Sequence, residues 1–405
     1  MAGRPPNNLV FRCFTRSNTV RIYDGSMDPF LRAAKAKQKE LIAFVKELVE
    51  CESPSDSPAA ISRFADLLEA RISDIAKVRR IRGGSFGPHL QCEFDLPGNT
   101  KRTQILVLGH SDTVYPLGTL TTMPFRQSRG RIYGPGAFDM KGGVAMFVFA
   151  MRILREQNIQ VRHKILLQLN SDEEVGSDSS RSITEKEASR SQAVLVLEPG
   201  QGSDGDAKTE RKGVGDYIVS VKGRASHAGV DFASGASAIL EVARQIEKIA
   251  AFTDLARGIT VNPGVISGGT RTNVVADSAR VEVDMRISRL KDAARVDKQF
   301  RSLKPVDKRC TIEVSGGLNR PPMEKTKASL VLFGKARDLA REIGIELKET
   351  STGGGSDGNF TAALGIPTLD GIGAVGEGAH SPGECIYVDR LADRTALLAK
   401  LLQSL

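Results

Sequence analysis

Residues 105–114 read Ile-Leu-Val-Leu-Gly-His-Ser-Asp-Thr-Val, and this stretch decides the predicted fold. Four consecutive apolar residues at 105–108 are typical of a parallel strand that is buried on both faces of a sheet. His110 follows where that strand is expected to end. Ligands of open α/β sheets bind beyond the carboxyl ends of the strands, so the stretch predicts both the fold class and the place of a site.

Two further apolar runs, at residues 165–169 and 193–197, show the same arrangement. Glu173 and Glu174 come shortly after the first run, and Glu198 directly follows the second. Segments with apolar residues at helical spacing lie around these runs, so strand and helix alternate along the chain. This alternation predicts an α/β fold with its functional side chains at one edge of the sheet. The spacing predicts helices over residues 28–50, 57–68, 142–155, 328–343 and 390–402.

Five short segments each supply one side chain that suits a metal ion. Imidazole and carboxylate groups suit Zn²⁺, and two ions about 3.5–4 Å apart can share one bridging carboxylate. A site with a pair of ligands for each ion and one bridge needs the set that this chain offers: His110, Asp139, Glu174, Glu198 and His380. Each of these residues alone has an ordinary structural explanation. However, the chain has only five histidines, and three fall in recognisable motifs, which favours a metal site.

Two acidic residues beside these ligands have expected roles of their own. Asp112 lies two residues after His110, so on a strand both side chains point the same way. We expect the Asp112 carboxylate to accept a hydrogen bond from the second ring nitrogen of a metal-bound His110. Glu173 and Glu174 are adjacent and cannot both face the same way in an extended segment. One of the two is expected to bind metal and the other to act as a general base.

The pattern changes near residue 213. From there the spacing predicts strands at 217–221, 259–266, 279–287 and 310–314, and helices at 235–251 and 291–303. This order predicts an α+β domain inserted into the α/β domain. We assign residues 212–322 to the insert and residues 27–211 and 323–405 to the catalytic domain. Residues 1–26 are interpreted as a disordered tail or a mis-assigned start before Met27.

Length and composition exclude several classes of protein. At 405 residues the chain is long enough for two domains, and no window holds the roughly 18 apolar residues of a membrane span. The net charge is +9, but the basic residues are dispersed along the sequence, so no nucleic acid partner is expected. The positive electrostatic field of such a protein suits an acidic substrate. Five cysteines without CxxC spacing argue for free thiols, and without a secretory signal we expect a cytoplasmic protein.

The motifs Gly-His-Ser-Asp-Thr-Val at 109–114 and Asp-Glu-Glu-Val-Gly-Ser at 172–177 resemble those of the zinc aminoacylase and carboxypeptidase superfamily. This superfamily includes glutamate carboxypeptidases, acetylornithine deacetylases, succinyl-diaminopimelate desuccinylases and tripeptidases. The resemblance is greatest to the bacterial folate-cleaving glutamate carboxypeptidases and extends from about residue 30 to the C-terminus. It implies two Zn²⁺ per subunit, with Co²⁺ or Mn²⁺ as alternatives, and a cis peptide bond after Asp139.

The resemblance also implies a role for each candidate ligand. His110 and Glu198 would bind one ion, and Glu174 and His380 the other. Asp139 would bridge the two ions, and Glu173 would act as the general base.

By the same resemblance, the insert is a ferredoxin-like dimerisation or lid domain. His227 would reach across a homodimer into the partner's active site, where Asn273 would contact the substrate. Arg320 resembles the arginine that binds the free α-carboxylate of the substrate, and the backbone at Gly355 would approach the same group. Arg286 is expected either to contact substrate or to support the sheet of the insert.

The implied activity is metal-dependent hydrolysis of an amide bond next to a free carboxylate. We expect a carboxypeptidase that releases C-terminal glutamate or a similar amino acid from small peptides or N-acyl amino acids. An N-acyl-amino-acid deacylase or an aminotripeptidase is the alternative within the superfamily, and Met140-Lys141-Gly142-Gly143 is closer to the deacylase branch. A metal-binding protein without catalysis is the alternative outside it. Lys208 and Arg211, in the linker to the insert, would either steer an acidic substrate or be solvated.

Overall fold

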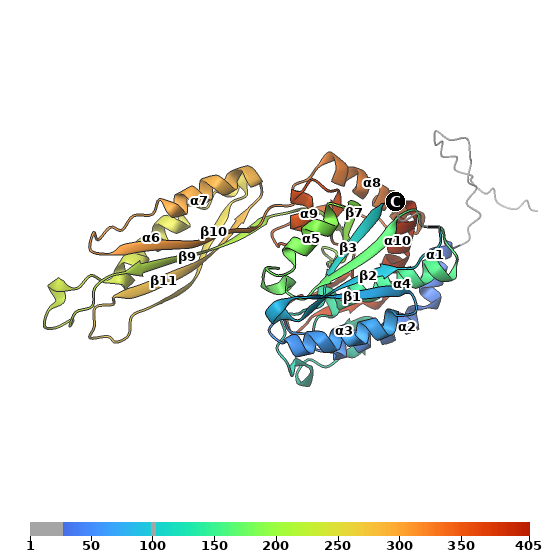
Figure 1. The fold of residues 1–405 in the computed structure, drawn as a ribbon, viewed down its shortest axis with the longest axis horizontal. Coiled ribbons are helices and arrows are strands. Elements are labelled where there is room, and N and C mark those ends of the chain that lie inside the picture. Colours follow the sequence, from blue (N-terminus) through green and yellow to red (C-terminus); the bar gives the residue numbers. More distant parts are fainter. Residues whose placement is uncertain (1–26, 99–102) are drawn as a thin grey trace, which may run out of the picture.

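The computed structural model describes residues 27–98 and 103–405, which form a larger and a smaller lobe (Figure 1). The larger lobe contains a six-stranded sheet in the order β1-β2-β6-β3-β7-β14. The four strands from β6 to β14 are parallel, and β2 and β1 continue the sheet in antiparallel pairing. The strands are β1 Ala76–Arg82, β2 Pro88–Phe94, β3 Gln104–His110, β6 Lys164–Asn170, β7 Ser191–Val196 and β14 Thr368–Leu369. The predicted α/β fold class is confirmed.

Strand β3 explains why the apolar run at 105–108 decides the fold. Ile105 and Val107 belong to one hydrophobic core, and Leu106 and Leu108 belong to a second core on the opposite face. Because successive side chains of a strand point to opposite faces, a run of four apolar residues fits a strand covered on both sides. The covering helices of this lobe are α1 Pro29–Ala36, α2 Gln38–Glu50, α3 Pro58–Ile72, α4 Gly142–Glu156, α5 Arg181–Ala188, α8 Lys327–Glu342, α9 Gly358–Ala363 and α10 Leu391–Ser404.

The single helix predicted over 28–50 is wrong, because two helices occupy this segment. Asp28 caps α1 by accepting the N–H groups of Phe30 and Leu31, and the helix ends at Lys37, whose backbone angles (φ −92°, ψ 3°) leave the helical range. Helix α1 packs mainly on α10 and also contacts α4, whereas α2 packs on α4 and α3. The apolar periodicity of the segment does not reveal where the backbone leaves the helical range.

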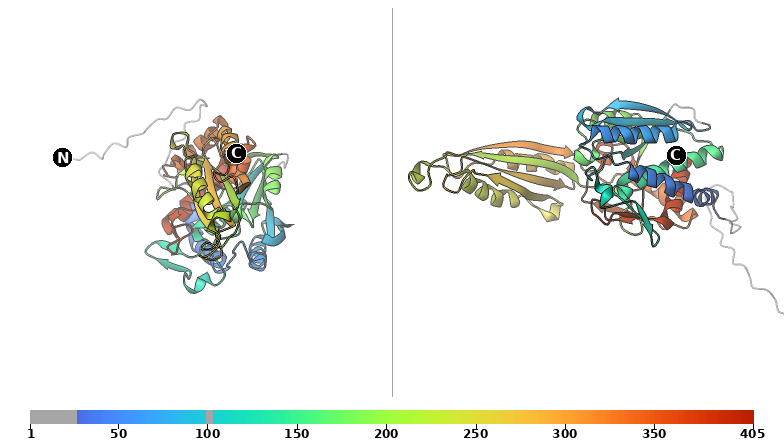
Figure 2. Two further views of the ribbon diagram at one scale, coloured as in Figure 1. Left: turned by 90° about the vertical axis from the view of Figure 1, so that its left-hand side faces the viewer. Right: turned by 90° about the horizontal axis from the view of Figure 1, so that it is seen from below.

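The smaller lobe is a four-stranded antiparallel sheet in the order β10-β11-β9-β12 with two helices, seen in yellow and orange in Figure 2. Its core lies between the sheet and these helices, where Tyr217 stacks on Phe300 with ring centroids 3.8 Å apart. Strand β10 is an edge strand. The elements are β9 Gly213–Lys222, α6 Ala238–Ala250, β10 Thr260–Gly268, β11 Ser278–Ile287, α7 Ala293–Arg301 and β12 Thr311–Arg320.

The two chain crossings between the lobes lie side by side. Arg211 and Met323 exchange two backbone hydrogen bonds of 3.0 Å, one in each direction. The smaller sheet begins at Gly213 and ends at Arg320, just inside the expected domain boundaries at 212 and 322. The larger lobe also holds a pair of strands, β8 Ala207–Arg211 and β13 Glu349–Thr352, and a small sheet of β4 Arg126–Ser128, β5 Arg131–Tyr133, β15 Gly376–Glu377 and β16 Cys385–Tyr387.

The described residues contain no helix with the length and apolar character needed to cross a membrane. Cys51, Cys92, Cys310 and Cys385 are free thiols, as the spacing predicted, and Cys13 lies outside the described residues, as does the expected tail at 1–26.

Candidate metal centre

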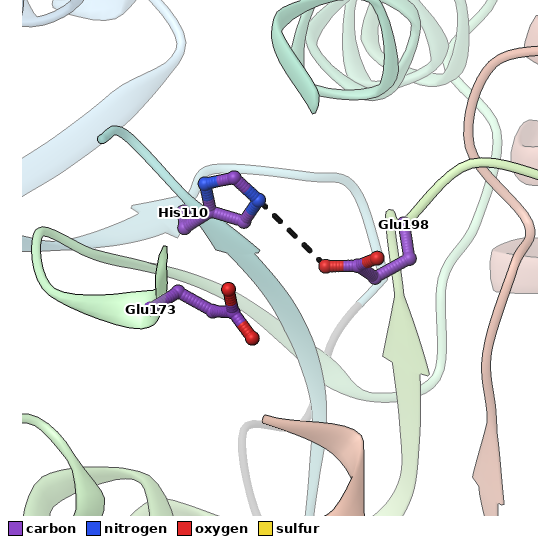
Figure 3. Close-up of side chains that lie close together, drawn as sticks. All are labelled: His110, Glu173 and Glu198. Atoms are coloured by element: carbon purple, nitrogen blue, oxygen red, sulfur yellow. Dashed lines mark ion pairs between the residues drawn. The ribbon is translucent and has the colours of Figure 1, made fainter. Parts of the chain in front are cut away.

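The predicted site segments meet at the carboxyl edge of the larger sheet. His110 is the last residue of β3, Glu198 lies just beyond the end of β7, and Glu173 and Glu174 share one 3₁₀ turn after β6. Figure 3 shows the side chains of His110, Glu173 and Glu198 around a common space at this edge. The rule that places sites beyond the carboxyl ends of parallel strands therefore locates these side chains correctly.

Asp139 lies between two histidines. Its Oδ1 is 3.2 Å from Nε2 of His110, and its Oδ2 is 3.3 Å from Nε2 of His380. Asp139 belongs to a short turn of π-helix, Ala137–Lys141, ahead of α4, and its peptide bond to Met140 is cis, as the resemblance implied. One carboxylate thus faces a different imidazole with each oxygen, which is the arrangement that a ligand bridging two ions requires.

The other candidate ligands surround this row of three side chains. Oε2 of Glu174 is 3.2 Å from Nε2 of His380, and Oε1 of Glu198 is 3.7 Å from Nε2 of His110. Two groups have donor atoms within 4.8 Å of one another: His110 with Asp139 and Glu174, and His110 with Glu173 and Glu198. The structure therefore brings all five predicted ligands and the adjacent Glu173 together.

Opposite charges dominate the electrostatics of this cluster. Hydrogen bonds with Asp139 and Glu174 raise the pKa of His380 to about 10. Burial opposes the charged form of Asp139, but the two histidines outweigh it and lower the pKa of this carboxyl. Burial and the nearby Asp139 raise the pKa of Glu198 to about 7. Protons on these groups balance part of the negative charge, and a bound cation would displace them.

The donor set fits two divalent cations. Two imidazoles and three carboxylates are the ligand types that Zn²⁺ and its first-row neighbours take in proteins. Within the described residues, Oε1 of Glu174 is buried without a hydrogen-bond partner. A buried carboxylate oxygen that lacks a donor is costly, so an ion at this position would satisfy it.

Asp112 contacts His110 with both its carboxylate and its main-chain oxygen. Nδ1 of His110 is 2.9 Å from the main-chain oxygen of Asp112 and 3.5 Å from its carboxylate, so the carbonyl is the nearer acceptor. The predicted contact with the carboxylate is therefore present, and the structure adds the main-chain oxygen of the same residue as a nearer acceptor. The Asp112 carboxylate also accepts the hydroxyl of Ser55 and the backbone N–H groups of Glu173 and Glu174.

Arg320 is buried against Glu173. Its Nη2 donates to the main-chain oxygen of Glu173 at 2.8 Å, to Oε1 of Glu173 at 3.0 Å and to the hydroxyl of Ser177 at 2.7 Å. The carboxylate of Asp357 lies 3.4 Å from the same nitrogen. Burial raises the pKa of Glu173, and Arg320 opposes that rise. Arg320 therefore orients the expected base, and its contact with a substrate carboxylate stays a prediction.

Arg211 is also buried, so the solvated alternative for this residue is wrong. Its guanidinium binds Asp370 through two hydrogen bonds of 2.7 and 2.8 Å and contacts Glu198 at 3.2 Å. It also donates to the carbonyl groups of Gly354 and Gly355. Lys208 is 7% exposed, and within residues 27–98 and 103–405 its ammonium has no hydrogen-bond or ion-pair partner.

His227 and Asn273 lie together on the smaller lobe. The N–H of Ala228 donates to the main-chain oxygen of Asn273 at 3.0 Å, and Nδ1 of His227 accepts the N–H groups of Gly229 and Val230. Both His227 and Asn273 are exposed. In the described part of this single chain, neither side chain bonds to a residue of the candidate metal centre.

The last two predicted residues lie near the junction of the lobes. Arg286 forms a bidentate pair with Asp284 and donates weakly, at 3.4 Å, to the carbonyl of Gly353. This pairing favours the interpretation that Arg286 supports the sheet of the insert. Gly355 lies against Arg320, since an added Cβ would be 3.1 Å from the Cδ of that arginine.

A family-wide sequence comparison matches residues 106–404 to peptidase family M20/M25/M40. The chain belongs to this family. Carboxypeptidase G2 of Pseudomonas sp. (strain RS-16) is 28% identical over 92% of this chain and 91% of its own length. Succinyl-diaminopimelate desuccinylase of Dechloromonas aromatica is 30% identical over 73% of this chain and 82% of its own length. The family M20 assignment confirms the suspected superfamily and identifies the chain as a metallopeptidase-family hydrolase.

The solved structures of family M20 share this fold. The YXEP protein of Bacillus subtilis, described as a dinuclear-metal-binding peptidase of the family, superimposes with a TM-score of 0.66. It is 14% identical, and the match covers 91% of this chain and 98% of that protein. At this identity the likeness shows the fold alone, and the evidence for a metal centre in this chain is the geometry of its own side chains.

Three residues of the site were missed by sequence reasoning: Asp357, Asp370 and Glu384. All three are buried, and each bonds to an element that lies far away in the chain. Asp357 lies two residues after Gly355, which the sequence analysis names, so its position could have indicated a role in the site. Asp370 and Glu384 lie in no recognisable motif, and only the packed structure reveals their partners.

Proposed function

We propose that this chain hydrolyses an amide bond next to a free carboxylate and uses two divalent metal ions, most simply Zn²⁺. The observation that carries the proposal is the position of Asp139, whose two oxygens lie 3.2 and 3.3 Å from two different histidines. The proposed ligands of one ion are His110 and Glu198, and those of the other are Glu174 and His380, with Asp139 as the bridge. Such ions act as Lewis acids and lower the pKa of a bound water.

Glu173 is the proposed general base. It lies beside the cluster, and Arg320 holds its carboxylate through Oε1, which leaves the second oxygen to accept a proton from the attacking water. Glu173 then returns this proton to the leaving amine. The raised pKa of the buried carboxyl suits a group that holds the proton between these two steps.

The proposed substrate is a small peptide or N-acyl amino acid with a C-terminal glutamate or similar residue. Lys208 supports an acidic substrate, because its ammonium has no hydrogen-bond or ion-pair partner among the described residues and a substrate carboxylate would provide one. The similarity to carboxypeptidase G2 supports the same choice. The similarity to a succinyl-diaminopimelate desuccinylase keeps N-acyl-amino-acid deacylation as the second candidate.

The proposed assembly is a homodimer through the smaller lobe. Strand β10 has one unpaired edge and exposes Val265 and Ile266, and α6 exposes Ile239 and Leu240. An exposed edge strand with apolar side chains is a template for pairing with a second strand. In such a dimer the exposed His227 and Asn273 would be available to the site of the partner.

The first experiment is amide hydrolysis by protein that has been stripped of metal and reloaded with zinc. The substrates are folyl-glutamate, N-acetyl-glutamate, N-acetyl-leucine, acetylornithine and a tripeptide, and Glu173→Ala is the inactive control. Zinc-dependent release of C-terminal glutamate supports the carboxypeptidase. If Lys208 binds an acidic side chain, Lys208→Met lowers kcat/KM on N-acetyl-glutamate and leaves N-acetyl-leucine unaffected. Turnover of acetylornithine alone would move the substrate to the deacylase branch, and no zinc-dependent hydrolysis would refute the function.

The shared active site has its own test. Glu173→Ala and His227→Ala are each expected to abolish most activity, but a co-expressed mixture contains heterodimers with one intact site. Recovery of activity in the mixture supports a site built from two subunits. A mixture as inactive as its components would exclude that arrangement for His227.

A further inference from the structure

Glu384 is a buried carboxylate that the proposed chemistry does not use. It is fully buried and lies between His380 and strand β16. Its Oε1 accepts the backbone N–H of Phe138 at 2.7 Å and the backbone N–H of Asp139 at 3.0 Å. Its Oε2 accepts the hydroxyl of Tyr115. Both oxygens are therefore occupied by donors of the protein, and Glu384 is not available as a metal ligand.

Tyr115 extends this contact to a third segment of the site. Its single hydroxyl proton is shared between Oε2 of Glu384 and the main-chain oxygen of Ser381, which lies 3.1 Å from the hydroxyl. Tyr115 lies five residues after His110, and Ser381 directly follows His380. The turn that carries His380 is closed by backbone bonds from Ser381 to Gly378 and from Glu384 to Ser381. One carboxylate thus joins the segments of His110, Asp139 and His380.

These three segments carry the row of side chains that defines the site. The oxygens of Asp139 face both histidines only while its backbone is held, and Glu384 binds the backbone N–H of that residue. Metal ligands must stay within tenths of an ångström of their positions, and partners that hold them change metal affinity even without touching the ion.

We propose that Glu384 is a positioning residue for the metal centre: it fixes Asp139 between the two histidines and, through Tyr115, fixes the turn that carries His380. The proposal rests on the two-metal site proposed above. Glu384 acts on the site through backbone hydrogen bonds and touches neither substrate nor ion.

The test compares Glu384→Ala, Glu384→Gln and Tyr115→Phe in the full chain. Zinc stoichiometry and Kd are measured by competition with a chelator, and the Co²⁺ absorption spectrum reports ligand geometry. Glu384→Ala is expected to weaken the binding of at least one zinc by roughly 10–100-fold and to change the Co²⁺ spectrum. Glu384→Gln keeps the oxygen that accepts both N–H groups and should bind zinc nearly as the natural protein does. Tyr115→Phe should fall between them.

Glu241 provides a matched control. It is also fully buried and accepts two backbone N–H groups, those of Val306 and Asp307 at 2.9 Å, but it lies in the smaller lobe. Glu241→Ala should lower the Tm of the metal-free protein and leave the zinc Kd unchanged. If Glu384→Ala behaves like this control, Glu384 is merely structural and the proposal is overturned.

The remaining outcomes separate this proposal from the function on which it rests. If Glu384→Ala does not fold, Tyr115→Phe decides: an unchanged zinc Kd and Co²⁺ spectrum would overturn the link to His380. If the unaltered protein binds fewer than two zinc ions, the proposed two-metal function fails first. Two ions bound with the same Kd in the unaltered protein and in Glu384→Ala would refute the positioning role alone.

Discussion

Replacing Arg211 with methionine should destabilise the larger lobe strongly. The substitution keeps an unbranched side chain but leaves Asp370 buried without its bidentate partner and removes the donor to two carbonyl groups. Removing one partner of a buried ion pair costs about 3–5 kcal/mol, because the other charge stays out of water. We expect the free energy of unfolding to fall by that amount. Arg211→Lys keeps the charge but not the fork, so its loss should be smaller.

The assay is urea unfolding of the metal-free protein followed by circular dichroism, since the chain contains no tryptophan. A double-mutant cycle with Asp370→Asn measures the interaction energy between Arg211 and Asp370. Because the two residues are in direct contact, the effects of the single substitutions on the free energy of unfolding should differ from additivity by about 0.5–3 kcal/mol. Arg309 is the control, because it forms a similar fork with Asp307 on the surface and Arg309→Met should leave the unfolding midpoint unchanged. Additive single effects, or a loss from Arg211→Met no larger than the control, would refute the reasoning.

Three further substitutions or conditions probe the site. Glu173→Gln keeps an oxygen for Arg320 but cannot accept a proton, so kcat should fall by roughly 10²–10⁴-fold. The zinc content, measured by atomic absorption, should stay unchanged. A parallel loss of zinc would contradict the assignment of Glu173 as the base. Because the pKa of His380 is raised to about 10, this group is protonated at neutral pH and zinc must displace the proton, so affinity should rise with pH between about 6 and 8. Calorimetry in buffers of different ionisation enthalpy should detect the released proton, and pH-independent binding would exclude this mechanism. Gly143→Ala would place a Cβ 2.3 Å from the carbonyl oxygen of Leu197, beside Glu198. We expect thermal unfolding to show a free energy of unfolding lower by about 1–3 kcal/mol and zinc binding to be weaker. Wild-type values for both quantities would show that the backbone adjusts freely.

The parts of the fold that could be predicted are those in which a local pattern has one physical cause. The apolar runs at 105–108, 165–169 and 193–197 became β3, β6 and β7 because both faces of the central sheet are buried. Strand β1 was missed because it reads Ala-Lys-Val-Arg-Arg-Ile-Arg. As an edge strand it keeps most side chains in water, so its charges conceal it.

The residues of the site likewise fall into those that the sequence could indicate and those that it could not. His110, Asp139 and His380 could be expected to lie together because few residue types can act as metal ligands, and these three lie in short recognisable segments. Arg211 and Asp370 could not be paired from the sequence, because 159 positions separate them and nothing local to either residue indicates a buried partner. Asp112 was correctly expected beside Nδ1 of His110, but the nearer contact of that nitrogen with the main-chain oxygen of Asp112 depends on the exact backbone path after β3.

The position of the insert within the chain has a consequence for biosynthesis. Strand β14 pairs with β7 at the edge of the large sheet, and α10 packs on α4, yet both come from the part of the chain after the insert. During translation the smaller lobe, whose strands are contiguous, can fold while the larger lobe still lacks these two elements and His380. Until the last residues leave the ribosome, α4 lacks its contact with α10, and β7 lacks its pairing with β14. Chains that terminate early should therefore be targets for chaperones and proteases rather than partly active enzymes.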